Sequence, residues 1–307
     1  MRIRSTVAAV TGALALSALV APAALAADGP KAPAGVAASN EAAHSAAGKT
    51  AFSTADVTGT PYALDATFSN VKVNKGKNIV VGTTAVVKVP VSFTLTHGVD
   101  VDIHASDFVS AVELYRGASF DDEEWWFDSG VAKCTDASDT VANCTATVAV
   151  DPLTLLNEDA GAWKAAAFAV AWNGQDPEDE NLDLSKVGVA VKDKAAAPYN
   201  LQRLSKLTVN ATPEPVKKGK TITVTGKLSR ANWETGKYAG YATQPVKLQF
   251  RKKSSSTYTT LKGIKSTSTG TLKTTTKATV DGYYRFSFAG TTTTPAVSAT
   301  GDYVDVK

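Results

Sequence analysis

The sequence predicts an all-β protein built from two β-sandwich domains in tandem. Apolar side chains occupy every second position from Val87 to Leu95 and again from Tyr284 to Phe288, which is the pattern of a strand with one buried face. Clusters of Gly, Pro, Asn and Asp separate such segments at short intervals, as turns do. After the N-terminal leader, no long segment sustains the period of roughly 3.6 residues that marks an amphipathic helix.

A change in the sign of the charge marks the boundary between the two predicted domains. Residues 27–200 contain 12 Lys and Arg against 24 Asp and Glu, a net charge of −12, whereas residues 201–307 contain 18 against 5, a net charge of +13. The overall formal charge of +3 therefore conceals an acidic half joined to a basic half. We expect an acidic sandwich over residues 51–194, a linker over 195–203 and a basic sandwich over 204–307.

Residues 1–26 have the features of a secretory signal peptide. Arg2 and Arg4 precede an apolar stretch over residues 7–20, and Ala24-Leu25-Ala26 is a small-x-small cleavage site. A membrane-spanning helix, the alternative, needs about 20 apolar residues and no cleavage site, so we predict a secreted protein with no membrane span after processing.

The segment that follows the leader, residues 27–50, is rich in Ala, Gly, Ser and Pro, and Val36 is its only sizeable apolar side chain. Such a composition buries too little apolar surface to offset the entropy of ordering the chain. The sequence therefore predicts a short disordered stalk.

The acidic domain alternates between strands and polar turns. Pro90 cannot donate a ladder hydrogen bond, so its strand is expected at a sheet edge or beside a bulge. Trp163 lies in an alternating strand and is expected in the core rather than at a sugar-binding surface. The strands expected in this domain are residues 64–73, 87–95, 109–115, 125–127, 145–150, 163–172 and 187–191.

The chain contains two cysteines, Cys134 and Cys144. An isolated pair in an exported protein is more often a disulfide than a metal site, and two thiolates supply only half of a zinc site. The polar residues between them fit a turn between two strands. We predict a disulfide that constrains the unfolded chain by about 2–3 kcal/mol.

Two acidic loops are candidate ligand-binding segments of the first domain. Trp125 and Trp126 are consecutive, so they point to opposite faces of a strand, and one is expected to be exposed for stacking on a glycan. A solvated acidic rim is the alternative, since neither loop has the spacing of an EF-hand. The candidate ligand-binding carboxylates beside the Trp pair are Asp121, Asp122, Glu123 and Glu124, and the candidate calcium ligands are Asp176, Glu178, Asp179, Glu180 and Asp183.

The sequence offers no catalytic motif: it lacks a G-x-S-x-G elbow, a phosphate loop and a dinucleotide fingerprint. His97 and His104 flank a loop with Asp100, Asp102 and Asp107, but the spacing matches no metal-binding motif, and a solvated loop is the simpler interpretation. We therefore predict a protein that is not an enzyme and needs no cofactor, with calcium as the one candidate ion.

The basic half repeats the rhythm of strands and turns. Its expected strands are residues 204–210, 221–228, 246–251, 258–264, 271–280, 282–288 and 302–306. Seven short strands separated by tight turns predict an immunoglobulin-like (Ig-like) sandwich. Trp233 falls between two of them and is either a loop plug or a ligand contact.

Three runs in this half resemble bacterial Ig-like modules: Lys218 to Gly226, Gln244 to Leu248 and Asp281 to Phe286. The whole layout resembles secreted tandem-sandwich proteins of high-GC Gram-positive bacteria, for which no activity is established. The resemblance implies a fold, and it implies neither an activity nor functional residues.

The basic domain is the strongest candidate for contact with a partner. Arg251-Lys252-Lys253 ends an expected strand, and Lys217, Lys218 and Lys220 flank a turn. Exposed lysines discourage aggregation at strand edges, but they also suit an anionic cell-wall polymer. Nucleic acid would satisfy the same charges, yet export and the lack of interleaved aromatic residues argue against it.

From these features we predict a non-enzymatic secreted or envelope-associated protein whose basic domain associates with anionic cell-wall polymer. A calcium- or glycan-binding module on the Trp-bearing acidic loops of the first domain is the alternative.

Overall fold

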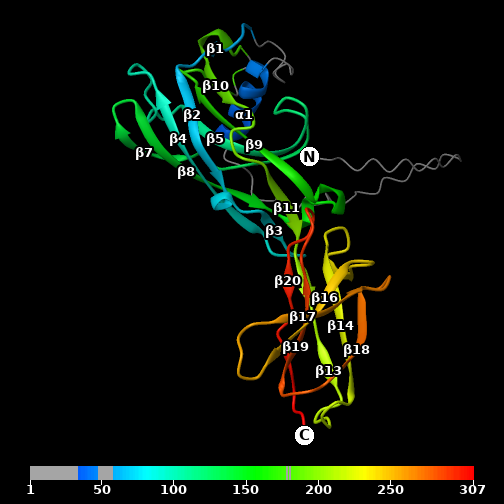
Figure 1. Cartoon of the computed structure of the whole chain (residues 1–307). Helices are drawn as coiled ribbons and strands as arrows, with labels where there is room; N and C mark the ends of the chain where they lie inside the picture. The colour runs from blue at the N-terminus through cyan, green and yellow to red at the C-terminus, as the bar shows by residue number, and fades with distance from the viewer. Residues whose placement is uncertain (1–33, 48–57, 178, 180) are drawn as a thin grey trace, which may run out of the picture.

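The computed structural model describes residues 34–47, 58–177, 179 and 181–307. Apart from one α-helix and short 3₁₀ turns the described chain is all-β, as predicted. Two sandwiches follow one another along the molecule, with the N-terminal one at the top of Figure 1 and the C-terminal one below it. The predicted signal peptide lies outside the described residues. Within those residues, no helix is long and apolar enough to cross a membrane.

The first sandwich has the strand order of an Ig-like domain. One sheet consists of β2 (Ala66–Val73), β4 (Val87–His97), β8 (Val141–Val150) and β7 (Lys133–Ser138), in that order. The facing sheet is built on β9 (Gly161–Ala171), with β5 (Phe108–Gly117) and β6 (Glu123–Asp128) on one side and β10 (Gly188–Lys192), β11 (Tyr199–Arg203), β1 (Tyr62–Ala63) and β3 (Ile79–Val81) on the other. Leaving aside β1, β3 and β11, this is the A-B-E-D and C′-C-F-G arrangement of Ig-like sandwiches.

The second sandwich has the same plan. Strand β14 (Thr221–Asn232) pairs with β12 (Ser205–Leu207), β13 (Asn210–Thr212), β15 (Lys237–Gly240) and β18 (Thr271–Lys277). The facing sheet runs β17 (Thr259–Lys265), β16 (Pro245–Lys252) and β19 (Gly282–Phe288), and β20 (Val297–Ser298) and β21 (Asp302–Val304) share the outer edge of β19. The core between them contains Ile222, Val224 and Leu248 from the strands predicted to alternate.

Pro90 lies in β4, which pairs with β2 on one side and β8 on the other, so the expectation of an edge strand is wrong. The reason is local. Strand β2 ends at Val73, opposite Val91, so no strand continues beside Pro90 on that side. The ladder around Pro90 therefore loses nothing from its missing N–H. A register shift does occur nearby, in β2 between Ser69 and Lys72.

The segment predicted to be a disordered stalk contains helix α1 (Ala34–Ala47), and for these residues the prediction is wrong. Val36, Ala42 and Ala43 are fully buried and pack on the outer face of β5, β9 and β10. Small alanine side chains let the helix lie close to the sheet, but they give only a weak helical pattern of hydrophobicity in the sequence. Figure 1 shows α1 beside these strands at the top of the molecule.

The predicted linker, residues 195–203, is also different in the structure, because Tyr199–Arg203 forms strand β11 of the first sandwich. This strand pairs with β9 on one side and β3 on the other, and it buries Tyr199 and Leu201. The chain enters the second sandwich directly at Ser205. The junction between the halves is therefore built from paired strands rather than from a spacer.

Candidate functional site

Lysines from separate parts of the sequence meet at the end of the second sandwich that lies beside the C-terminus, at the bottom of Figure 1. Lys218 N donates to Lys307 O at 2.7 Å, and Val306 N donates to Asp281 Oδ1 at 2.9 Å. Lys253 N donates to Asp281 O at 3.0 Å, which joins the end of β16 to the same place. We call this group of exposed lysines the distal basic end: Lys217, Lys218, Lys220, Lys252, Lys253, Lys277 and Lys307.

The carboxylates at this end are fewer and are engaged in local bonds. Asp281 accepts hydrogen bonds from Val306 N and from the Tyr303 hydroxyl, and these bonds hold the pKa of Asp281 below its usual value. Asp305 lies 3.8 Å from the ammonium of Lys307, an exposed pair of the kind that contributes little stability. Most of the positive charge therefore faces solvent uncompensated by neighbouring acids.

A row of aromatic rings and cations crosses the outer face of the sheet next to this end. The guanidinium of Arg251 lies 3.8 Å from the ring centre of Tyr283, whose ring centre is 5.2 Å from that of Tyr303. On the other side of Arg251, the Tyr258 ring has its centre 5.4 Å from that guanidinium and 3.8 Å from the guanidinium of Arg285. We call Tyr258, Arg251, Tyr283, Tyr303 and Arg285 the Tyr–Arg row.

The Tyr–Arg row contradicts the expectation that no aromatic residues accompany the basic charges. Strand alternation contained the signal, because Tyr284, Phe286 and Phe288 fill the core and Tyr283 and Arg285 must then point outward. The alternation along one strand does not predict which side chain of the adjacent strand lies next to each residue. The pairing of Arg251 with Tyr283 and of Tyr283 with Tyr303 depends on the register of three strands.

The two consecutive Trp residues of the first sandwich point to opposite faces of β6, as expected for a strand. Trp125 packs against the core, and Trp126 points the other way and is 37 % exposed. Trp163 is buried, with Nε1 donating to Asp159 O at 2.8 Å. Trp233, from the second half, is also buried in the first core and acts as a plug.

The two acidic loops do not meet. Strands β5 and β9 are antiparallel, with Phe108 opposite Ala171 and Tyr115 opposite Lys164. The loop after β5 and the loop after β9 therefore lie at opposite ends of the sheet, separated by roughly 25 Å for a strand of this length. Loops so far apart supply no common ligand site.

Two described carboxylates of the second loop, those of Asp179 and Asp183, cap local turns. Asp183 accepts from Ser185 N and Oγ, and these bonds lower the pKa of Asp183, while Asp179 accepts from Asn181 N. Glu178 and Glu180 lie outside the described residues, as do the side chains of Glu123 and Glu124. Among the residues that are described, no three His, Cys, Asp or Glu form a group able to hold a metal ion.

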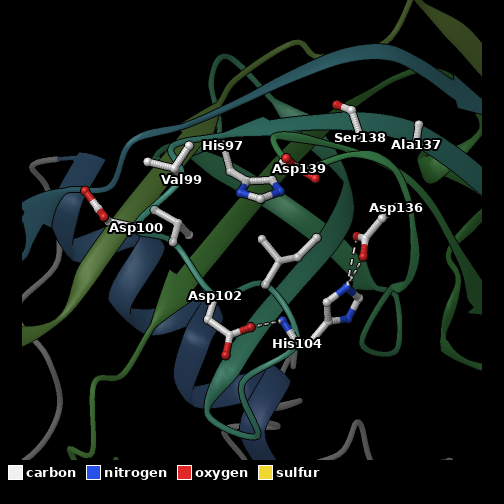
Figure 2. A pocket seen from close by; sticks show the side chains of 11 residues that line it. His97, Val99, Asp100, Asp102, His104, Asp136, Ala137, Ser138 and Asp139 are labelled. Carbon is white, nitrogen blue, oxygen red and sulfur yellow. Dashed lines mark hydrogen bonds and ion pairs between the residues drawn. The ribbon is translucent and has the colours of Figure 1, made fainter.

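Cys134 and Cys144 form the predicted disulfide, directly opposite each other on β7 and β8. The turn of this hairpin forms one wall of a cavity of about 530 Å³. The loop after β4 forms the other wall (Figure 2). The loop that we expected to be merely solvated therefore lies opposite the turn of the β7–β8 hairpin. Residues 97, 99–104 and 136–139 line the cavity. Asp107 is elsewhere and accepts from Gly174 N at 2.7 Å.

No family model matches this sequence, and a search of curated proteins found no match. Among solved structures, the chain is similar to an I-band fragment, I67-I69, from titin, at 11% identity over 79% of this chain and 65% of that one, with a TM-score of 0.27. It is also similar to tandem Ig repeats of Dlar, at 11% identity over 80% of this chain and 99% of that one, with a TM-score of 0.19. A third similar structure is the BSP domain of a biofilm associated protein, at 9% identity over 80% of this chain and 52% of that one, with a TM-score of 0.22.

Proposed function

We propose that this is a non-enzymatic, exported protein whose second sandwich binds an anionic polymer of the cell wall through the distal basic end and the Tyr–Arg row. The observation that carries the proposal is the gathering of lysines from four chain segments at one end of a net positive domain. Lysines that serve only to protect strand edges have no reason to converge.

The side chains at this end are available for a partner. Lys217, Lys218, Lys220, Lys252 and Lys253 are all exposed, and within the described part of the chain none of them has a carboxylate within ion-pair distance. Several like charges at one end of a domain raise the local concentration of a polyanion and speed its association. A flexible polymer with repeated negative charges can engage all of them at once.

The Tyr–Arg row adds geometry to this charge. Arg251 donates from Nη1 to Ser255 O at 2.8 Å, and Arg285 donates from Nε to Gln249 Oε1 at 2.8 Å. These bonds, with the stacking on tyrosine, hold each planar guanidinium in one orientation before any ligand arrives. A guanidinium held in place loses less entropy on binding and offers paired donors to a phosphate or carboxylate.

Trp126 supports a second candidate function. Its ring is partly exposed on the outer face of the sheet that contains β6, next to the loop that carries Asp121 and Asp122. An exposed indole of this kind can stack on a neutral sugar ring. Glycan binding there would be independent of salt, unlike binding at the distal basic end.

If the distal basic end binds an anionic polymer, the binding should depend on salt and on the lysines of that end. The full-length secreted protein should bind isolated cell walls at low salt and lose most of that binding between about 0.05 and 0.3 M salt. Replacing Lys217, Lys218, Lys220, Lys252 and Lys253 with Gln should weaken binding at least tenfold in a pull-down titration. The matched control replaces five exposed lysines of the first sandwich, Lys72, Lys75, Lys77, Lys88 and Lys133, with Gln.

Because both variants lose the same net charge, the control shows whether binding depends on the position of the lysines or only on the overall charge. Equal loss in both variants would mean that only overall charge matters. Unchanged binding in the distal variant would refute the proposed surface.

The Tyr–Arg row predicts a difference between two cations of equal charge. Arg251→Lys keeps the charge but removes the planar donors and the stacking on Tyr283, so polymer affinity should fall roughly three- to tenfold. Lys247→Arg, on the same strand at an exposed position, is the control and should leave the affinity unchanged. Equal affinities for the Arg251→Lys variant and the wild type would show that the row only stabilises the sheet.

A further inference from the structure

The cavity between the loop after β4 and the turn of the β7–β8 hairpin has an acidic rim. Asp100 and Asp102 lie on the loop, and Asp136 and Asp139 lie on the hairpin. Figure 2 shows His97 between the loop and the hairpin and His104 near Asp136, while the Asp100 carboxylate points away from the hairpin and Asp102 Oδ1 accepts from His104 N at 2.9 Å. His104 Nε2 lies 2.9 and 3.0 Å from the two carboxylate oxygens of Asp136, which ties the loop to the hairpin across one side of the cavity.

His97 supplies an unsatisfied acceptor at the base of this cavity. Its side chain is 9 % exposed, and Nδ1 lies 3.0 Å from Gly98 O. A carbonyl oxygen only accepts, so Nδ1 carries the hydrogen of this bond, and a ring with that one N–H presents its lone pair at Nε2. Among the described residues, none forms a hydrogen bond with that buried Nε2. A buried polar atom without a partner is costly, so its persistence here points to a ligand.

The walls around His97 are held in place by the backbone and by the disulfide. His97 N donates to Thr140 O at 2.9 Å, which brings the hairpin turn against the end of β4. Cys134 and Cys144 cross-link β7 and β8 two residues before Asp136, which pairs with Ala142. The cavity is therefore a built feature of the hairpin and not a gap between mobile loops.

We propose that this cavity binds a primary ammonium group. The group must donate a hydrogen bond to His97 Nε2, and the surrounding carboxylates require it to be positive. A primary ammonium has three donors, one for the imidazole and two for the acidic rim. Val99 and Val101 line the same cavity and offer apolar contact to the carbon chain that carries the nitrogen. A metal ion fits less well, because the described side chains do not group into a set of three ligands.

The test uses the full-length secreted protein, with n-butylammonium as the probe and the ¹⁵N resonances of the histidine side chains as the readout. Saturable binding with a dissociation constant on the order of millimolar is expected for so small a ligand, with a large shift of the His97 Nε2 signal. Tetramethylammonium has the same charge and no N–H donor, and it should bind at least tenfold more weakly. Titrations with glucosamine and with Nα-acetyl-lysine amide then show whether an amino sugar or a lysine side chain supplies the ammonium better.

Two variants locate the site. Asp139→Asn lies on an exposed turn that tolerates the change, and it should weaken n-butylammonium roughly tenfold. His97→Phe should abolish the binding, and its melting temperature shows whether the fold survives. Asp122→Asn, an equivalent exposed carboxylate on another loop, should bind as the wild type does. Equal binding of tetramethylammonium, an unmoved His97 signal, or full affinity in Asp139→Asn would each overturn the proposal, as would tight zinc binding that the same substitutions remove.

Discussion

Replacing Trp233 with alanine should lower the free energy of unfolding by about 3–5 kcal/mol, the range found when a buried Trp or Phe is truncated. Trp233 comes from a loop of the second sandwich, yet its side chain is 3 % exposed inside the core of the first. Nε1 donates to Gly82 O at 2.8 Å, so truncation also leaves a partly buried carbonyl without its donor. Removing this side chain opens a cavity at the place where the two halves meet.

The same substitution should separate the unfolding of the two halves. Besides Trp233, the junction contains the buried Arg203, whose Nε donates to Ala231 O at 2.6 Å, and Asn157, whose Nδ2 donates to Asn232 and Glu234. We expect these contacts to make the halves unfold together in the wild type, and Trp233 has the largest side chain among them. In the Trp233→Ala variant a urea titration should show two transitions, whereas the wild type should show one.

Two controls define the result. Trp233→Phe keeps most of the packing and loses the bond to Gly82, so it should cost about 1 kcal/mol and keep a single transition. Trp126→Ala removes an exposed indole and should change stability little. A single transition in Trp233→Ala with an unchanged midpoint would show that the junction contributes nothing to stability.

The sequence predicts those parts of this fold that depend on residues close together along the chain. The alternation from Val87 to Leu95 identifies β4 and its buried face, and the isolated cysteine pair identifies the disulfide of the β7–β8 hairpin. Each of these patterns is local, and burial of one face is enough to produce it. The all-β class and the two sandwiches in tandem follow from the same local patterns.

What the sequence did not predict depends on contacts between distant segments. Strand β9 is apolar at nearly every position, a sign that both of its faces are covered, yet nothing in the strand says that helix α1 covers the outer one. The Tyr–Arg row and the cavity at His97 could not be predicted for the same reason. Each depends on which strand or loop lies opposite, and this register is a property of the assembled sheet.

Substituting Ala43 with glutamate should detach helix α1 from the sheet. Ala43 is fully buried on the outer face of the β5–β9–β10 layer, so the longer side chain has no room and its charge no solvent. The helix is held there by specific bonds as well: Asn40 Nδ2 donates to Glu113 at 2.7 Å, and Trp172 Nε1 donates to Ser39 Oγ at 3.0 Å. Asn40 and His44 of this helix contact the buried Glu113, so a new carboxylate at position 43, next to His44, also adds repulsion between like charges.

Detachment and unfolding of the helix should be one event, because a helix of 14 residues is marginal in water without tertiary contacts. Hydrogen exchange of the amides of residues 36–47 should therefore rise to nearly unprotected rates in Ala43→Glu, and the uncovered Phe168 and Val170 should bind a hydrophobic dye. Ala37→Glu makes the same chemical change at an exposed position of the same helix and should keep the protection of the wild type. If both variants retain protection, the buried face of α1 is not what holds the helix in place. If both lose it, helix propensity rather than docking decides its order, and the outer face of β9 must be covered in some other way.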